Sequence, residues 1–254
     1  MTKTWRTAIA SHWTWFAVVT IAAMIAVAAV VASAADSGTD GAAPEPLGMS
    51  ADGIGFVAQN GTVVLATGSS EHTADVIGMS TDTPVVDVYL DWSCPACKSI
   101  EAAYGPELAA KLGAGEIALT YHPIAFLDSK FQGSRYSSRA GNAAACVANY
   151  APDRFLDVQS AFFAAQPEEG TSGLTDDEII ALVHQAGVQA PEIDGCIADE
   201  AFADWVKQAT QRTVSDSGLF NADGRFSTPA VIINGSRWGG KGDLMDAIPL
   251  GGAA

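Results

Sequence analysis

The stretch VVDVYLDWSCPACKSI, residues 85–100, decides the fold of this chain of 254 residues. Its first six residues are mostly β-branched or aromatic, which predicts a strand over 85–90. The pattern becomes helical from 94 to 112, and EIALTYH at 116–122 predicts a second strand. A strand, a helix and a strand in this order predict a β-α-β unit with two adjacent parallel strands.

The two cysteines of this stretch lie where the strand passes into the helix. At a helix start, unpaired backbone N–H groups and the positive end of the helix dipole favour the thiolate of Cys94, the nucleophilic form. Pro95 suits the first helical turn, because its missing N–H has no intrahelical partner there. Cys97 is close enough to resolve a mixed disulfide formed at Cys94. The pattern therefore predicts a redox-active pair.

Two other interpretations of this cysteine pair stay open. A structural zinc site needs two further ligands at suitable spacing, and the sequence has no second CxxC and no paired histidines. We therefore predict no metal. An inert structural disulfide is the other alternative.

Further elements are predicted on both sides of the β-α-β unit. Residues 54–58 and 62–66 flank Asn60-Gly61, which favours a β-hairpin. Helical periodicity predicts four helices, over 134–149, 153–165, 175–186 and 200–217. Thr175 and Glu178 form a capping-box pattern, and Gly218 is an expected helix stop. The chain then returns to a strand over 230–233, a turn at 234–235 and a short helix over 243–248.

The N-terminus predicts export. Residues 13–35 carry no charge, and as a helix they would span about 34 Å against a hydrocarbon core of roughly 30 Å. Lys3 and Arg6 precede them, so residues 1–12 are expected in the cytoplasm and the rest outside, held by a single-pass anchor. The alternative is a signal peptide cleaved after the small residues 32–34. Residues 36–48 are small, polar and proline-containing, which predicts a flexible linker.

Charge narrows the classes of partner. The chain has 13 Lys and Arg against 29 Asp and Glu, a net charge of −16. Residues 1–35 hold two of the basic residues and no acidic ones, so the remainder carries 11 − 29 = −18. This acidity repels phosphate backbones, and we expect no nucleic-acid partner.

The motif DWSCPAC at 91–97, with STPAVIING at 227–235, resembles the DsbA-like branch of the thioredoxin superfamily. The resemblance implies an α/β thioredoxin-like fold over 49–254, preceded by the N-terminal β-hairpin. The 135 residues from Cys94 to Pro229 leave room for the family's helical insertion, at about 134–218. It also implies that Thr228 and Pro229 form a cis-proline motif that faces the cysteines and binds an extended substrate. Trp92 can line a substrate groove or pack in the core.

The resemblance also implies a function. It points to an extracytoplasmic enzyme that oxidises cysteines of exported proteins through Cys94 and Cys97, without a dissociable cofactor. Its expected partners are protein thiols and a membrane redox protein, which is a quinone-linked reoxidase for an oxidase or a thiol donor for a reductase. Two alternatives remain: a thiol reductase of the same fold, and a protein-binding module with a structural disulfide.

Three further positions add to this interpretation. Family members often bury an acid on the first central strand, six positions before the nucleophile, where this chain has Val88. Cys146 and Cys196 both fall in the expected insertion. In an oxidising compartment we predict a structural disulfide between them, and two buried free thiols are the alternative.

Overall fold

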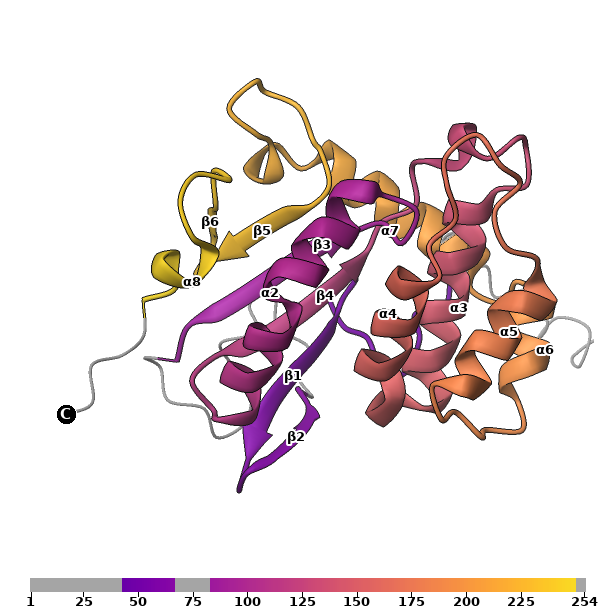
Figure 1. Ribbon diagram of the computed structural model, residues 1–254, viewed down its shortest axis with the longest axis horizontal. Coiled ribbons are helices and arrows are strands. Elements are labelled where there is room, and N and C mark those ends of the chain that lie inside the picture. Colours follow the sequence, from indigo (N-terminus) through magenta and orange to yellow (C-terminus); the bar gives the residue numbers. More distant parts are fainter. Residues whose placement is uncertain (1–42, 67–82, 250–254) are drawn as a thin grey trace, which may run out of the picture. The chain divides into compact units, whose positions relative to one another are not determined.

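The computed structural model describes residues 43–66 and 83–249 (Figure 1). The predicted anchor or signal peptide at 13–35, and residues 36–42 of the predicted linker, lie outside them. Among the described residues, no helix combines the length and the apolar character needed to cross a membrane.

A mixed β-sheet forms the centre of the fold. Its strands lie in the order β2-β1-β4-β3-β5-β6. Their bounds are β1 Ile54–Gln59, β2 Thr62–Leu65, β3 Val85–Leu90, β4 Ala118–Pro123, β5 Ala230–Ile233 and β6 Ser236–Arg237. β3 and β4 are parallel and adjacent, as the β-α-β pattern predicts, and every other pair of neighbours in this sheet is antiparallel.

The N-terminal hairpin is confirmed and forms one edge of this sheet. Asn60 and Gly61 both have positive φ, 51° and 74°, which is the conformation that this turn requires. β1 pairs with β2 on one side and with β4 on the other. The hairpin is therefore part of the central sheet.

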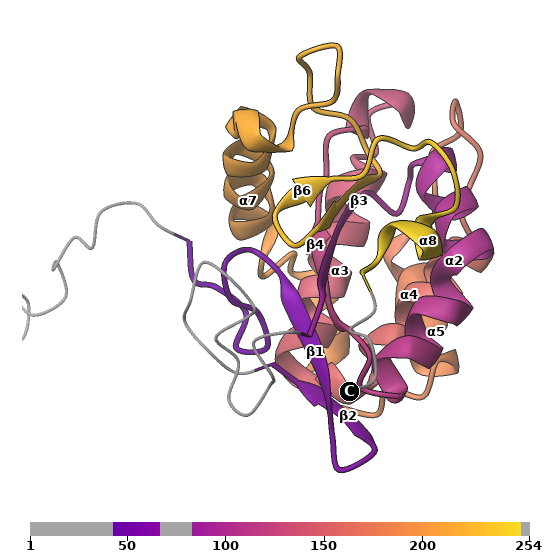
Figure 2. The same cartoon turned by 90° about the vertical axis from the view of Figure 1, so that its left-hand side faces the viewer.

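Helices cover both faces of the sheet. α2 (Pro95–Gly113) connects β3 to β4 and packs on one face, where Leu108 and Leu112 are buried. Figure 2 views the sheet nearly along its plane and shows α7 (Ala203–Ser215) on the opposite face. The short α8 (Leu244–Ala247) lies on the same side as α2 (Figure 2).

The predicted helical insertion is confirmed between β4 and β5. With α7, it comprises α3 (Tyr136–Tyr150), α4 (Phe155–Ala164), α5 (Asp176–Gln185) and α6 (Ile193–Ala198). α3 lies at its centre, and its small side chains let the neighbouring helices approach closely. A Cβ added at Gly141 would lie 3.0 Å from Cγ1 of Val206 on α7. α5 begins with the predicted capping box of Thr175 and Glu178.

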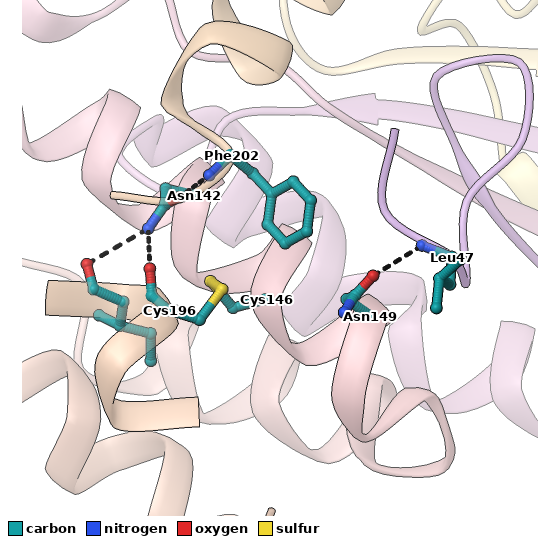
Figure 3. The surroundings of a disulfide bond; sticks show 7 residues. Leu47, Asn142, Cys146, Asn149, Cys196 and Phe202 are labelled. Atoms are coloured by element: carbon teal, nitrogen blue, oxygen red, sulfur yellow. Dashed lines mark hydrogen bonds between the residues drawn. A yellow bond between two sulfur atoms is a disulfide. The ribbon is translucent and has the colours of Figure 1, made fainter. Parts of the chain in front are cut away.

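Part of the predicted flexible linker is packed on the domain, so that prediction is wrong for residues 43–48. The Leu47 N–H donates to Oδ1 of Asn149 on α3 at 2.8 Å (Figure 3). A Cβ added at Gly48 would lie 2.0 Å from the Ala148 carbonyl oxygen, so only glycine fits there. Met49, which follows, is buried.

Two details of the insertion also differ from the prediction. α6 is not predicted, because six residues are too short to give a helical period. Gly218 does not end the last long helix: α7 ends at Ser215, and Gly218 lies in a 3₁₀ turn over 217–219. There the Gly218 N–H donates to the Asp216 carboxylate at 2.8 Å.

Candidate active site

Cys94 occupies the N-cap of α2, directly after the turn that ends β3. Its backbone is extended, with φ −83° and ψ 118°, and Pro95 begins the helix. The Cys94 carbonyl accepts the first helical hydrogen bond, from the Lys98 N–H at 3.1 Å. Cys94 and Cys97 are free thiols with exposed fractions of 7% and 2%. The helix start thus presents one sulfur near the surface and keeps the other beneath it.

The two thiols have opposite acid–base character. The Cys97 thiol lowers the pKa of Cys94 to about 6, helped by the Thr228 side chain and the N–H groups of Ala96 and Cys97, while burial opposes this change. Burial, followed by interaction with Cys94, raises the pKa of Cys97 well above its ordinary value. Cys94 is therefore the candidate nucleophile.

The Thr228–Pro229 peptide lies against Cys94 from the other side. This peptide bond is cis and immediately precedes β5, whose Ala230 is paired with Tyr89 of β3. The Cys94 thiol donates to the Thr228 carbonyl oxygen, with 3.6 Å between sulfur and oxygen. Oγ1 of Thr228 is buried and has no hydrogen-bond partner among the described residues. Its hydroxyl is therefore available to donate to a Cys94 thiolate.

A buried acid lies inside the cysteine motif, at a position that the sequence pattern does not single out. Asp91 is fully buried and accepts five hydrogen bonds. The donors are the Ser93 N–H and hydroxyl, the Ser137 hydroxyl and the N–H groups of Phe126 and Leu127. Burial raises the pKa of Asp91, and the hydrogen bonds oppose that change. Asp91 thus connects the active-site turn to α3 and to the segment after β4.

Of the two roles that the sequence leaves open for Trp92, the structure has core packing and not the lining of a substrate groove. Its side chain points into the core, where the residue is 1% exposed. The indole ring meets Phe155 and Phe162 of α4 edge to face, with centroid distances of 6.3 and 6.1 Å. An indole ring carries a large apolar area, and burying it in edge-to-face contact with other rings stabilises the fold. This explains why the Trp92 side chain points inward.

Two other aromatic residues lie on the segments that flank the site, the exposed Phe126 and the half-buried Phe226. Phe126 follows β4, is 40% exposed and meets the Phe226 ring edge to face at 6.0 Å. The Phe126 N–H bonds to Asp91, three residues before Cys94, while Phe226 lies two residues before Thr228. The sequence alone does not single out this pair, because the two residues are 100 positions apart.

Cys146 of α3 and Cys196 of α6 form a disulfide, with 5.9 Å between their Cα atoms (Figure 3). Asn142, one turn before Cys146, supports the same junction. Its Nδ2 donates to the carbonyls of Cys196 and Ile197, both at 3.4 Å, and its Oδ1 accepts from the Phe202 N–H at 2.8 Å. The disulfide and this amide hold α6 and the start of α7 against α3.

A separate pocket of about 330 Å³ lies between α2 and α4. Neither cysteine of the CxxC motif lines it. Glu101 on its wall accepts a hydrogen bond from Gln159 Nε2 at 3.1 Å, and burial raises the pKa of this carboxyl. Across residues 43–66 and 83–249, no cluster of three or more His, Cys, Asp or Glu can hold a metal ion.

Comparison with known proteins places this arrangement in a family. A family model described as thioredoxin matches residues 70–245. The chain belongs to the thioredoxin family. Among solved structures, reduced DsbA from Mycobacterium tuberculosis is similar over 74% of this chain and 84% of its own, with 26% identity and a TM-score of 0.58. Reduced DsbG, a disulfide-bond oxidoreductase of the same species, matches over 64% and 74%, with 30% identity and a TM-score of 0.54.

These matches show a DsbA-like thioredoxin fold, which is the fold of thiol-disulfide oxidoreductases. Among curated sequences, the serine/threonine-protein kinase PknE of M. tuberculosis is 31% identical over 161 residues. Those residues make up 61% of this chain and 27% of the kinase. The chain thus spans about a quarter of the length of this relative.

Proposed function

We propose that the protein is an extracytoplasmic thiol-disulfide oxidoreductase that oxidises cysteine pairs of exported proteins. The observation that carries this proposal is the opposite acid–base character of two adjacent thiols beside Thr228–Pro229. Cys94, with a pKa lowered to about 6, is the sulfur that exchanges with substrate. Cys97, buried and with a raised pKa, is the internal partner.

The reaction starts from the oxidised pair. A substrate thiolate attacks Cys94 Sγ, which breaks the Cys94–Cys97 bond and leaves the electron pair on Cys97, which takes up a proton. The second thiolate of the substrate then attacks the substrate sulfur that is bonded to Cys94. This forms the substrate disulfide and releases Cys94 as a thiolate. The substrate gains one disulfide and loses two electrons, which the enzyme now holds as two reduced cysteines.

The acidity of Cys94 supports the oxidising direction. A stabilised thiolate stabilises the reduced enzyme and makes the disulfide a stronger oxidant. A pKa of about 6 lies between the values of about 7 for thioredoxin and about 3.5 for DsbA. We expect a reduction potential between those of the same two proteins, about −270 and −120 mV. A membrane quinone-linked partner would then reoxidise the pair.

The surroundings of Cys94 suit a peptide substrate. In this proposal, Thr228 and Pro229 align an extended chain beside the sulfur, as the family resemblance implies. The exposed Phe126 and the half-buried Phe226 together supply an apolar surface for side chains flanking the substrate cysteine.

An oxidising compartment is supported by two features. The uncharged residues 13–35 are long enough to direct export, either as an anchor or as a cleaved signal. The buried disulfide of Cys146 and Cys196 is of a kind that persists mainly outside the cytoplasm.

Trapping a mixed disulfide tests the proposal. With Cys97→Ala, the complex cannot be resolved internally, so the Cys94 thiolate should attack a disulfide of scrambled, oxidised ribonuclease, release one ribonuclease sulfur as a thiolate and accumulate in a reducible adduct. Cys94→Ala is the matched control and should form none. The wild-type protein should also oxidise reduced ribonuclease faster than it reduces insulin.

The outcomes separate the alternatives. A protein that reduces insulin but does not oxidise ribonuclease is a reductase. Absence of adducts together with inactivity in both assays would leave only a binding module with a structural disulfide.

A further inference from the structure

Gln166 connects the helical insertion to the backbone that carries Cys94. It follows the end of α4, and its side-chain amide reaches the active-site turn. Nε2 donates to the carbonyl oxygen of Trp92 at 2.7 Å and to that of Cys94 at 3.1 Å. One side-chain amide thus donates to the carbonyl before Ser93 and to the carbonyl after it.

The same turn is held from its opposite side by Asp91. The Ser93 N–H donates to the Asp91 carboxylate at 2.9 Å, and the Cys94 N–H donates to the Asp91 carbonyl at 2.9 Å. The N–H groups of the turn are therefore fixed by Asp91, and its carbonyls by Gln166. Loss of the Gln166 bonds would remove the side-chain donor from the Trp92 carbonyl, whereas the Cys94 carbonyl would keep the Lys98 N–H.

Gln166 itself is held in place by its neighbours. Phe162, one turn earlier on α4, packs edge to face on the Trp92 ring at 6.1 Å. Beyond Gln166, the Gly170 N–H donates to the Lys130 carbonyl at 2.8 Å, and Gln132 Nε2 donates to the Gly170 carbonyl at 2.5 Å. The amide is thus presented to the active-site turn by a fixed segment.

The two N–H groups act on charge as well as on position. The oxygens that they bind are the negative ends of two carbonyl dipoles, one on Cys94 itself and one on Trp92, two positions before it in the same turn. An amide donor reduces the field of those oxygens at the sulfur, and in a partly buried site such dipoles act strongly. Without the donor, both carbonyls would oppose the negative charge on Cys94.

We propose that Gln166 is a positioning residue through which the helical insertion stabilises the thiolate form of Cys94. This inference rests on the proposed role of Cys94 as the exchanging sulfur. It adds a determinant of redox strength that lies 72 residues away in the chain and outside both the CxxC motif and the Thr228–Pro229 peptide.

Three substitutions separate the donor from the volume of the side chain. Gln166→Glu keeps the shape but removes both donors and adds a negative charge. Gln166→Leu removes the donors without a charge, and Gln166→Lys restores donors. Gln185→Glu, at an exposed position on α5, is the matched control for the change of charge.

The measurements are the pH profile of Cys94 alkylation and the equilibrium of the Cys94–Cys97 pair with glutathione. We expect Gln166→Glu to raise the pKa of Cys94 and to shift the equilibrium constant at least tenfold toward the disulfide, about 30 mV. Gln166→Leu should give a shift of the same sign, roughly threefold. Gln166→Lys should stay within threefold of wild type or shift the other way, and Gln185→Glu should match wild type.

The inference is overturned if Gln166→Glu and Gln166→Leu stay within twofold of Gln185→Glu. It is also overturned if Gln166→Lys shifts as far as Gln166→Leu in the same direction, because only volume would then matter. If Gln166→Glu does not fold, the leucine and lysine variants decide. Neither readout needs a protein substrate, so failure of the trapping experiment and failure of this inference are distinguishable.

Discussion

The thiolate of Cys94 should give the reduced protein a stability that depends on pH. Its pKa is lowered from 9.0 to about 6 in the folded protein. The resulting stabilisation is complete above pH 9 and is lost as the pH falls toward 6. At pH 7 the folded protein holds roughly ten thiolates per thiol and the unfolded chain roughly one per hundred thiols, which corresponds to about 1.4 kcal/mol. Because the sulfur is only partly shielded from solvent, we expect about 1 kcal/mol.

The assay is denaturant unfolding of the reduced protein at pH 5 and pH 7, compared with Cys94→Ser. The difference between the two proteins should grow by about 1 kcal/mol from pH 5 to pH 7, since little thiolate remains at pH 5. Other titrating groups cancel in this comparison. Cys97→Ser should keep most of the pH dependence, because serine retains a donor and Cys97 itself stays protonated in this range. A difference that is flat with pH, or a Cys94 alkylation midpoint near pH 8.5, would refute the reasoning.

Three further predictions follow from other contacts. Replacing Cys146 and Cys196 with alanine should lower the free energy of unfolding by about 4 kcal/mol, because their bond closes a loop with a sequence separation of 50; unfolding without reductant measures this. Asp91→Ala should cost roughly 3–5 kcal/mol because it removes the shared acceptor of five donors, three of them in buried contacts, and hydrogen exchange should rise at Phe126. Arg237→Ala should slow mixed-disulfide formation roughly tenfold, as measured by stopped-flow kinetics. Arg237 donates to the carbonyls of Leu219 and Ser227 and so holds the segment that leads to Thr228–Pro229.

Elements with a strong local signal are predicted by the sequence and found in the structure. β3 is a run of β-branched and aromatic residues, and the Asn60-Gly61 turn requires positive φ at both positions. α5 begins at a capping box. In each of these elements, neighbours in the chain determine the conformation.

Elements whose conformation depends on distant contacts are missed. Residues 43–48 have the composition of a linker, yet they dock because Asn149 and the backbone of Ala148 offer them a fitting surface. α6 has too few residues for a period, and the disulfide at Cys196 joins it to α3. Composition cannot reveal partners that lie 100 or 50 residues away.

The residues of the candidate site also fall into these two groups, those with a local sequence signal and those whose placement depends on distant contacts. The CxxC pair and Thr228–Pro229 are visible as motifs, because the residue types themselves carry the chemistry. Trp92 is next to Cys94 in the motif, but its orientation is set by Phe155 and Phe162 of α4, which no local pattern indicates.

The side chains of the dipeptide between the cysteines do not account for the acidity of Cys94, although the Ala96 N–H contributes to it. Pro95 and Ala96 carry no charge, and no side-chain donor of theirs reaches the sulfur. A carboxylate as close as Asp91 would oppose a thiolate if its charge were uncompensated, but five donors surround its oxygens. Three of these donors come from the Ser137 hydroxyl and the segment after β4, and Gln166 holds the other side of the same turn from the end of α4. Cys97, Thr228 and the Ala96 N–H lower the pKa of Cys94 directly. The residues between β4 and β5 add the donors to Asp91 and, in our proposal, Gln166, so chains with an identical CxxC motif should differ in redox strength when their insertions differ.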